Sequence, residues 1–319
     1  MIKLTSFGES HGVAVGGVIE GCPSGITLDL QLIKEDLARR ATGKTSSESQ
    51  RREPDEVEFL SGLLDGVTLG TPIAFMVRNT DARPEDYEDM KDMFRPSHAD
   101  FTYQAKYGIR DWRGGGRASA RTMLPYVVAG AIAKQLLAPH GIKIVADVHS
   151  IGGESDPAKI AALLQQCRDA GDTVGGIVHG SITGLPAGLG EPLDDKFQAC
   201  LAKAMFTIPA VKGFEYGDGF AMASMKGSEA NDQMSSLRGA SATKQPEGSS
   251  TEGRKSIFLS NHSGGILGGI TNGEEVFFNV AFKPIPTLGR GNRHDVCALP
   301  RATVIVEAMA ALTILRFMP

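Results

Sequence analysis

Six short stretches of the chain combine apolar residues with the β-branched and aromatic types that favour extended structure. They span residues 13–20, 73–78, 142–151, 174–183, 219–225 and 275–282. Stretches of this length, bounded by glycine, proline and other turn residues, are typical of β-strands. The sequence therefore predicts six strands, distributed over the whole chain.

Two longer segments, residues 122–137 and 302–317, are apolar almost all round. A helix with so little polar face belongs in the interior of a large protein, so we expect both to be buried helices. Two further segments with a helical pattern, residues 31–40 and 195–205, each follow a turn that contains glycine and proline. This mixture of strands and helices predicts an α+β fold.

The two turns that precede the second pair of helices have the same spacing of glycine and proline. The matching positions are Gly21, Pro23 and Gly25 in the first turn, and Gly184, Pro186 and Gly188 in the second. Each half of the chain also contains one arginine-rich loop that runs into one apolar helix. We therefore predict a single domain, residues 1–319, built of two related halves (about 1–150 and 151–319). The alternative is that two Gly-Pro turns coincide by chance.

One segment departs from this pattern. Residues 235–256 are rich in serine, glycine, threonine, lysine and proline and contain almost no apolar residues. A segment that cannot bury apolar surface gains little from folding, so we expect a mobile loop there.

The composition is that of a soluble globular protein. Of the 319 residues 41% are apolar and 22% are charged, and the formal net charge of −4 argues against a general nucleic-acid-binding surface. The chain has no secretory signal at its start and no apolar run of the roughly 20 residues needed to span a bilayer, which predicts a cytoplasmic protein without a membrane partner. Its four cysteines have no paired spacing, so no metal site or disulfide framework is expected.

Arginine and glycine are concentrated in two loops, residues 110–121 and 290–301. The first contains four arginines and one acid, Asp111, around three glycines at positions 114–116. Guanidinium groups and glycine N–H groups at the start of a helix both bind phosphate or carboxylate well. These loops predict a site for a small, multiply anionic ligand; a solvated basic turn is the alternative for the first. A third basic cluster at residues 39–52 is weaker evidence, since helix ends favour cations.

Two histidines stand in segments with no regular structural pattern. His11 lies between glycines at positions 8 and 12, and His98 follows a proline and Arg95. Histidine exchanges a proton readily near neutrality, so both are candidate catalytic residues. Asp295 lies among the arginines of the second loop, where it could accept a proton, orient a ligand or only neutralise its neighbours.

Several motifs that span nearly the whole chain occur together in one known order. They are Phe7-Gly-Glu-Ser-His-Gly, Gln50-Arg-Arg-Glu-Pro-Asp, Arg95-Pro-Ser-His-Ala-Asp, Arg113-Gly-Gly-Gly-Arg-Ala-Ser-Ala-Arg, Pro186-Ala-Gly-Leu-Gly-Glu-Pro, Ala210-Val-Lys-Gly, Asn261-His-Ser-Gly-Gly-Ile-Leu-Gly-Gly-Ile and Arg293-His-Asp-Val-Cys. In these motifs and their order the chain resembles the chorismate synthase family.

The resemblance implies a fold, a reaction and an assembly. The fold is a sandwich of helices between antiparallel sheets, and the assembly is a homotetramer. The reaction is the 1,4-anti elimination of phosphate from 5-enolpyruvylshikimate 3-phosphate to give chorismate, which depends on reduced FMN without net redox change. The substrate carries one phosphate and two carboxylates, and the cofactor adds another phosphate, so the arginine clusters have anions to bind. The chain has no Gly-x-Gly-x-x-Gly fingerprint, which favours an external reductant over reduction of FMN by NADPH on the chain itself.

The resemblance also implies roles for individual residues. His11 protonates the leaving phosphate, His98 donates to the reduced flavin, and Asp295 helps to remove the C6 proton. The expected substrate contacts are Ser10, Arg40, Arg51, Arg110, Arg121 and Arg301. The expected cofactor contacts are Arg117, Ala118, Ser119, Pro209, Ala210, Gly268, Lys283, Thr287 and Arg293.

The chain departs from the family's pattern at several places. The usual Arg-Arg-Arg-Pro-Gly is here Arg39-Arg40-Ala41-Thr42-Gly43, a further arginine of that loop is Ser46, and the usual Lys-Pro-Thr-Ser-Ser is Lys283-Pro-Ile-Pro-Thr. The segment between Lys283 and Arg293 is shorter than usual, and residues 235–256 are an insertion. These changes keep open a catalytically lapsed flavin-binding relative, and the arginine loops keep open a nucleic-acid-binding protein. Steep salt dependence of oligonucleotide binding would identify the latter.

Overall fold

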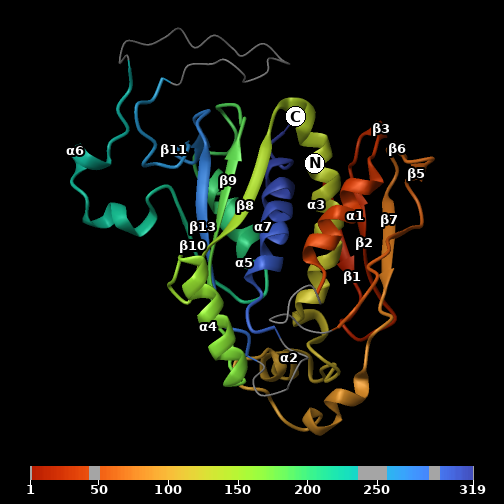
Figure 1. Cartoon of the computed structure of the whole chain (residues 1–319). Helices are drawn as coiled ribbons and strands as arrows, with labels where there is room; N and C mark the ends of the chain where they lie inside the picture. Colours follow the sequence, from red (N-terminus) through yellow and green to blue (C-terminus); the bar gives the residue numbers. More distant parts are fainter. Residues whose placement is uncertain (1, 43–50, 236–256, 287–294, 319) are drawn as a thin grey trace.

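The computed structural model describes residues 2–42, 51–235, 257–286 and 295–318. Two four-stranded antiparallel sheets form the outer layers, and four helices lie between them (Figure 1). The expected α+β sandwich is therefore confirmed. Thr287 and Arg293, and all of the predicted mobile loop except Ser235, lie outside the described residues.

The first sheet has the strand order β1-β2-β7-β4. Its strands are β1 (Lys3–Phe7), β2 (Ala14–Glu20), β7 (Ile73–Arg78) and β4 (Glu58–Phe59). Alternate residues of β7, namely Ile73, Phe75 and Val77, are buried against the helices. A small sheet of β3 (Ser24–Thr27), β6 (Val67–Leu69) and β5 (Leu63–Leu64) adjoins it.

The second sheet has the strand order β10-β13-β9-β8. Its strands are β10 (Val211–Tyr216), β13 (Val276–Phe282), β9 (Gly176–Thr183) and β8 (Lys143–Ile151). Strand β13 has the period-two burial of a sheet with one face on the core, since Val276, Phe278, Val280 and Phe282 are buried. A short hairpin is formed by β11 (Ile266–Leu267) and β12 (Ile270–Thr271).

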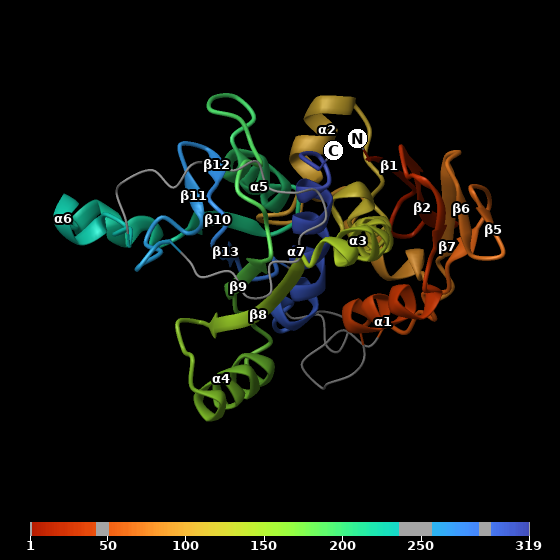
Figure 2. The same ribbon diagram turned by 90° about the horizontal axis from the view of Figure 1, so that it is seen from above.

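The helices between the sheets are α1 (Leu30–Arg40), α3 (Leu124–Leu137), α5 (Phe197–Phe206) and α7 (Leu299–Ile314) (Figures 1 and 2). The remaining helices are α2 (Asp100–Tyr107), α4 (Pro157–Asp169) and α6 (Gly227–Ala230), with short 3-10 turns η1 (Pro84–Met90), η2 (Gly116–Ala118), η3 (Ala120–Met123), η4 (Ala138–His140) and η5 (Gly219–Ser224). Helix α3 packs on α7 at Gly130, where an added Cβ atom would overlap Ala308. The two apolar segments are therefore buried helices, as expected.

One charged residue lies inside this core. Glu307 of α7 is only 4% exposed and accepts hydrogen bonds from Arg39 (2.6 and 2.7 Å), Lys134 (3.1 Å) and the N–H of Ala146 (3.2 Å). These partners come from α1, α3 and β8. Because a buried carboxylate is stable only when it is paired, this cluster fixes four elements to one another.

Five of the six predicted strands are present within a few residues of the expected bounds, but the one predicted at residues 219–225 is wrong. Those residues form the 3-10 turn η5, and the strand lies upstream as β10. Gly217 and Gly219 have φ of +57° and +54°, which turns the chain out of the sheet. Phe220 is consequently 83% exposed instead of packing on the core.

The two Gly-Pro turns are closed by the same hydrogen bonds. In each, a threonine that is 2% exposed accepts a bond from a backbone N–H and donates one to a proline carbonyl. The groups are Pro23, Ile26 and Thr68 in the first half, and Pro186, Leu189 and Thr271 in the second. This repeated detail supports our proposal that the domain consists of two related halves.

Among the described residues, every helix is too short or too polar to traverse a bilayer.

Candidate active site

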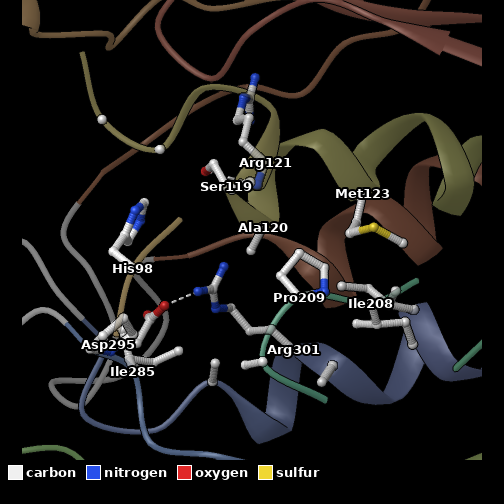
Figure 3. Close-up of a pocket in the computed structure, with 18 of the residues that line it drawn as sticks. His98, Ser119, Ala120, Arg121, Met123, Ile208, Pro209, Ile285, Asp295 and Arg301 are labelled. Atoms are coloured by element: carbon white, nitrogen blue, oxygen red, sulfur yellow. Dashed lines mark hydrogen bonds and ion pairs between the residues drawn. The ribbon is translucent and has the colours of Figure 1, made fainter. Parts of the chain in front are cut away.

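A cavity of about 580 Å³ opens at one end of the helical layer and is lined by residues from both halves of the chain. This volume lies within the range of small-molecule sites. Thirteen of the predicted site residues line it: His11, Arg40, Arg51, His98, Arg117, Ala118, Ser119, Arg121, Pro209, Ala210, Lys283, Asp295 and Arg301. Figure 3 shows an apolar side made by Met123, Ile208 and Pro209, and a polar side where His98, Asp295 and Arg301 lie.

His11 lies in the turn between β1 and β2 and is packed tightly. Its Nδ1 lies 3.1 Å from the Ser10 hydroxyl, and the Tyr87 ring stands edge-on at 4.9 Å between ring centroids. An added Cβ atom on Gly114 would overlap the imidazole, so the glycine loop touches it directly. Burial, and the cations of Arg51 and Arg113, lower the pKa of His11 to about 4. The ring is therefore neutral near pH 7.

His98 lies just before α2, with its Nδ1 beside two groups of opposite hydrogen-bonding type. Asp100 Oδ1 is 3.2 Å away and Arg95 Nη2 is 3.1 Å away. Burial, and then the Arg95 cation, lower the pKa of His98. Burial acts to raise the pKa of Asp100, but hydrogen bonds from Arg95 outweigh it and hold that pKa at about 2. Nδ1 can thus donate to Asp100 or accept from Arg95, so Nε2 can act as acceptor or donor in the cavity.

Three buried arginines converge on the cavity from separate elements. Arg40 ends α1, Arg121 lies in η3, and Arg301 lies in the first turn of α7. Asp55 bonds the first two and Asp295 pairs with the third. The Nε atoms of Arg40 and Arg301 are buried and have no hydrogen-bond partner among the described residues. Buried donors of this kind are costly, which makes them suited to an anionic ligand.

The other basic residues also hold the walls of the cavity together. Arg51 donates to Glu53 at 2.6 Å and to the carbonyl of Ser10 at 3.2 Å. Arg117 connects the glycine loop to β1 by donating to the Gly8 carbonyl (2.9 Å) and the Ser6 hydroxyl (2.7 Å). Lys283 donates to a backbone carbonyl at 2.8 Å, and burial, together with Lys212, lowers its pKa.

Three predicted site residues do not line the cavity. Ser10 is fully buried behind His11. Arg110 Nη2 donates to the carbonyls of Met90, Lys91 and Met93, and its Nη1 lies 3.8 Å from Asp100 Oδ1, so it fixes that loop; its substrate contact stays a prediction. Gly268 lies in the turn between β11 and β12.

The backbone around the cavity has a feature that the sequence does not predict. The non-glycine residues of the described chain with positive φ are Asp55 (48°), Asp65 (50°), Ser97 (56°) and Ala210 (71°). All but Asp65 line the cavity. Such conformations cost roughly 1–3 kcal/mol each and gather at functional sites. Only Ala210 was expected at the site, because nothing in the residue types of the other two marks this geometry.

Known proteins are similar in sequence to this chain along nearly its entire length. The family model described as chorismate synthase matches residues 2–318. A curated chorismate synthase of Porphyromonas gingivalis is 46% identical over 98% of this chain and 93% of its own length. The corresponding protein of Christiangramia forsetii is 46% identical over 98% of this chain and 94% of its own length.

A solved structure, "Crystal Structure of Chorismate Synthase", superposes with a TM-score of 0.77 at 29% identity and covers 99% of this chain and 91% of that one. The comparison of folds and the comparison of sequences therefore point to the same family over nearly the whole chain. The chain belongs to the chorismate synthase family.

Proposed function

We propose that the cavity is the site where this chain, a chorismate synthase and lyase of the shikimate pathway, eliminates phosphate from 5-enolpyruvylshikimate 3-phosphate. We assign the reaction to this cavity because Arg40, Arg121 and Arg301 converge there. The substrate has a phosphate of about −1.5 to −2 charge at neutral pH and two carboxylates. Three guanidiniums, partly offset by Asp55 and Asp295, give the cavity cationic groups for such an anion.

The residues present also fit reduced FMN. The apolar side made by Met123, Ile208 and Pro209 suits an aromatic ring system, and Arg117 and Lys283, which line the same cavity, are cations that would bind its phosphate. When bound, reduced FMN supplies the electron density that allows the C–O bond to break without net redox change.

His11 is suited to give the leaving phosphate a proton. Its pKa of about 4 reflects burial and neighbouring cations, and a phosphate beside the ring opposes the effect of Arg51 and Arg113. Anion binding therefore favours the protonated ring, which would pass its proton to the phosphate oxygen. Arginine contacts hold the phosphate in place during this transfer.

Asp295 and His98 complete the proton transfers. The ion pair with Arg301 orients Asp295 and holds its carboxylate beside an arginine that we expect to bind the substrate. Asp295 is therefore suited to take the C6 proton. His98, with Nδ1 satisfied in either tautomer, is suited to hold or donate a proton from Nε2 toward the reduced flavin. The same family relationship supports a cytoplasmic homotetramer. The lack of a Gly-x-Gly-x-x-Gly fingerprint supports FMN that is reduced externally, not by NADPH on the chain itself.

Turnover with the substrate and anaerobically reduced FMN tests this function. The purified chain should release phosphate and form chorismate, and His11→Ala or His98→Ala should each lower the rate roughly 10²- to 10⁴-fold. His179→Ala is the matched control, because that side chain bonds Asn279 away from the cavity. A folded protein that releases no phosphate contradicts the proposal, and FMN binding without turnover identifies a lapsed relative.

Nucleic-acid binding is the weaker alternative. Arg40, Arg121 and Arg301 are between 5 and 9% exposed, so their guanidiniums are not available to the backbone of a large polyanion.

A further inference from the structure

Asp55 is bonded to two of the cavity arginines through separate oxygen atoms. Its Oδ2 accepts from Arg40 Nη2 at 2.5 Å, and its Oδ1 accepts from Arg121 Nη1 at 2.5 Å. All three side chains are at most 6% exposed. Because the lone pairs of one carboxylate serve both guanidiniums, the position of one arginine determines that of the other.

The two arginines are held to different degrees. Arg121 also donates from Nε to Asn79 Oδ1 at 2.7 Å and from Nη2 to the carbonyl of Arg78 at 3.3 Å, so strand β7 fixes it independently. Among the described residues, the Arg40 guanidinium is hydrogen-bonded to Asp55 alone. Asp55 thus transmits the fixed position of Arg121 to Arg40.

Without this carboxylate the cluster is unfavourable. Burial, and the nearby cations of Arg121 and Arg301, lower the pKa of Arg40, while Asp55 acts in the opposite direction. Repulsion between buried cations would move Arg40, which has fewer hydrogen bonds than Arg121, away from the others. Arg40 would then no longer hold its place in the cavity wall.

The backbone at Asp55 indicates that its position is required. Its φ is +48°, in the left-handed region that non-glycine residues rarely adopt, although aspartate and asparagine tolerate it best. Such a conformation persists only where the surroundings impose it. Here the two short hydrogen bonds to the arginines do so.

We propose that Asp55 is a positioning residue that presents Arg40 to the anionic substrate, an inference that rests on the function proposed above. The opposing view is that Asp55 only neutralises charge. The two views predict changes of opposite sign when the charge is removed. Loss of a neutralising carboxylate makes the cavity more cationic and strengthens anion binding, whereas loss of a positioning carboxylate weakens it.

The substitution Asp55→Asn separates these views. The carboxamide keeps the size of the side chain and tolerates the positive φ, but its NH₂ group cannot accept a bond, so one arginine loses its partner. We expect the KM for 5-enolpyruvylshikimate 3-phosphate and the Kd of inorganic phosphate, used as a probe, to rise roughly 10- to 100-fold, as for a lost charged hydrogen bond. Unchanged or tighter binding overturns the proposal.

Asp65→Asn is the matched control. Asp65 has nearly the same φ, +50°, but lies in an exposed turn away from the cavity. It undergoes the same chemical change, so its variant should bind both ligands like the parent protein.

A double-mutant cycle with Arg40→Ala provides the second measurement. If Asp55 acts through Arg40, Asp55→Asn should weaken phosphate binding further by less than about 3-fold in the Arg40→Ala background. If the two substitutions instead raise the Kd of phosphate independently, so that their fold-changes multiply in the double variant, the proposal is overturned. If Asp55→Asn does not fold, Asp55→Glu distinguishes the same two views, because it keeps the charge but moves the carboxylate. Weaker phosphate binding would support positioning, and phosphate affinity like that of the parent protein would support neutralisation. Absence of turnover in the parent protein refutes the proposed function, while phosphate affinities still decide the role of Asp55.

Discussion

Gly114→Ala should displace His11 without changing the histidine side chain itself. Gly114 has φ of +64°, and an added Cβ atom would lie closer than 3.0 Å to both Nδ1 and Cε1 of the imidazole. Ordinary contacts of a Cβ atom are 3.4–4 Å. The ring, which is also held by Ser10 and Tyr87, must therefore retreat or the glycine loop must move.

The substitution has two effects, one on the stability of the fold and one on the rate of the reaction. A left-handed conformation at an alanine costs roughly 1–2 kcal/mol of stability. A displacement of about 1 Å at a catalytic group costs roughly 10²-fold in rate. We therefore expect Gly114→Ala to lower kcat for phosphate release by about 10²-fold, with a modest loss of thermal stability.

Gly108→Ala separates the two effects. Gly108 ends α2 with φ of +73°, and an added Cβ atom there meets nothing within 4 Å. Its variant should show the stability loss alone, measured by thermal unfolding, with near-normal kcat for phosphate release under reduced FMN. If both variants have the same kcat, the contact between the glycine loop and His11 has no catalytic role and the reasoning fails.

Two further predictions concern buried carboxylates. Glu307→Gln should lower the free energy of unfolding in urea by about 3–5 kcal/mol, because it breaks a buried ionic cluster. Glu58→Gln, in the exposed pair with Arg78, should cost under about 1 kcal/mol, and equal losses would contradict the role given to burial. Asp100→Asn should destabilise most above about pH 4, the unfolded-state value. Its pKa in the folded protein is lowered to about 2, so the difference from the parent should shrink as pH falls from 4 toward 2, and a pH-independent difference would refute it.

Much of the candidate site could be predicted because its chemistry is carried by residue types in short motifs. His11, His98 and Asp295 were singled out from sequence, and the structure brings all three to the same cavity. The geometry of their neighbours could not be predicted, since it depends on contacts between distant segments. Asp55 is an example, because its partners lie 15 and 66 residues away.

The errors have equally specific causes. Residues 219–225 are more apolar than those of β10, so residue type favoured the wrong segment, and two glycines with positive φ decide the outcome. Arg110 resembles the other loop arginines in sequence, yet its Nη2 donates to three backbone carbonyls and the residue does not line the cavity, so its predicted substrate contact stays untested. A sequence shows that a cation is present but not which acceptors surround it.

The place of α7 in the chain has a consequence for how the protein folds during synthesis. This helix is buried between both sheets and carries Arg301 and Glu307, yet it follows every element against which it packs. Until it leaves the ribosome, Arg39 and Lys134 lack their shared carboxylate, and the apolar surface that α7 covers is exposed to water. We therefore expect the earlier elements to stay partly assembled until α7 has been synthesised.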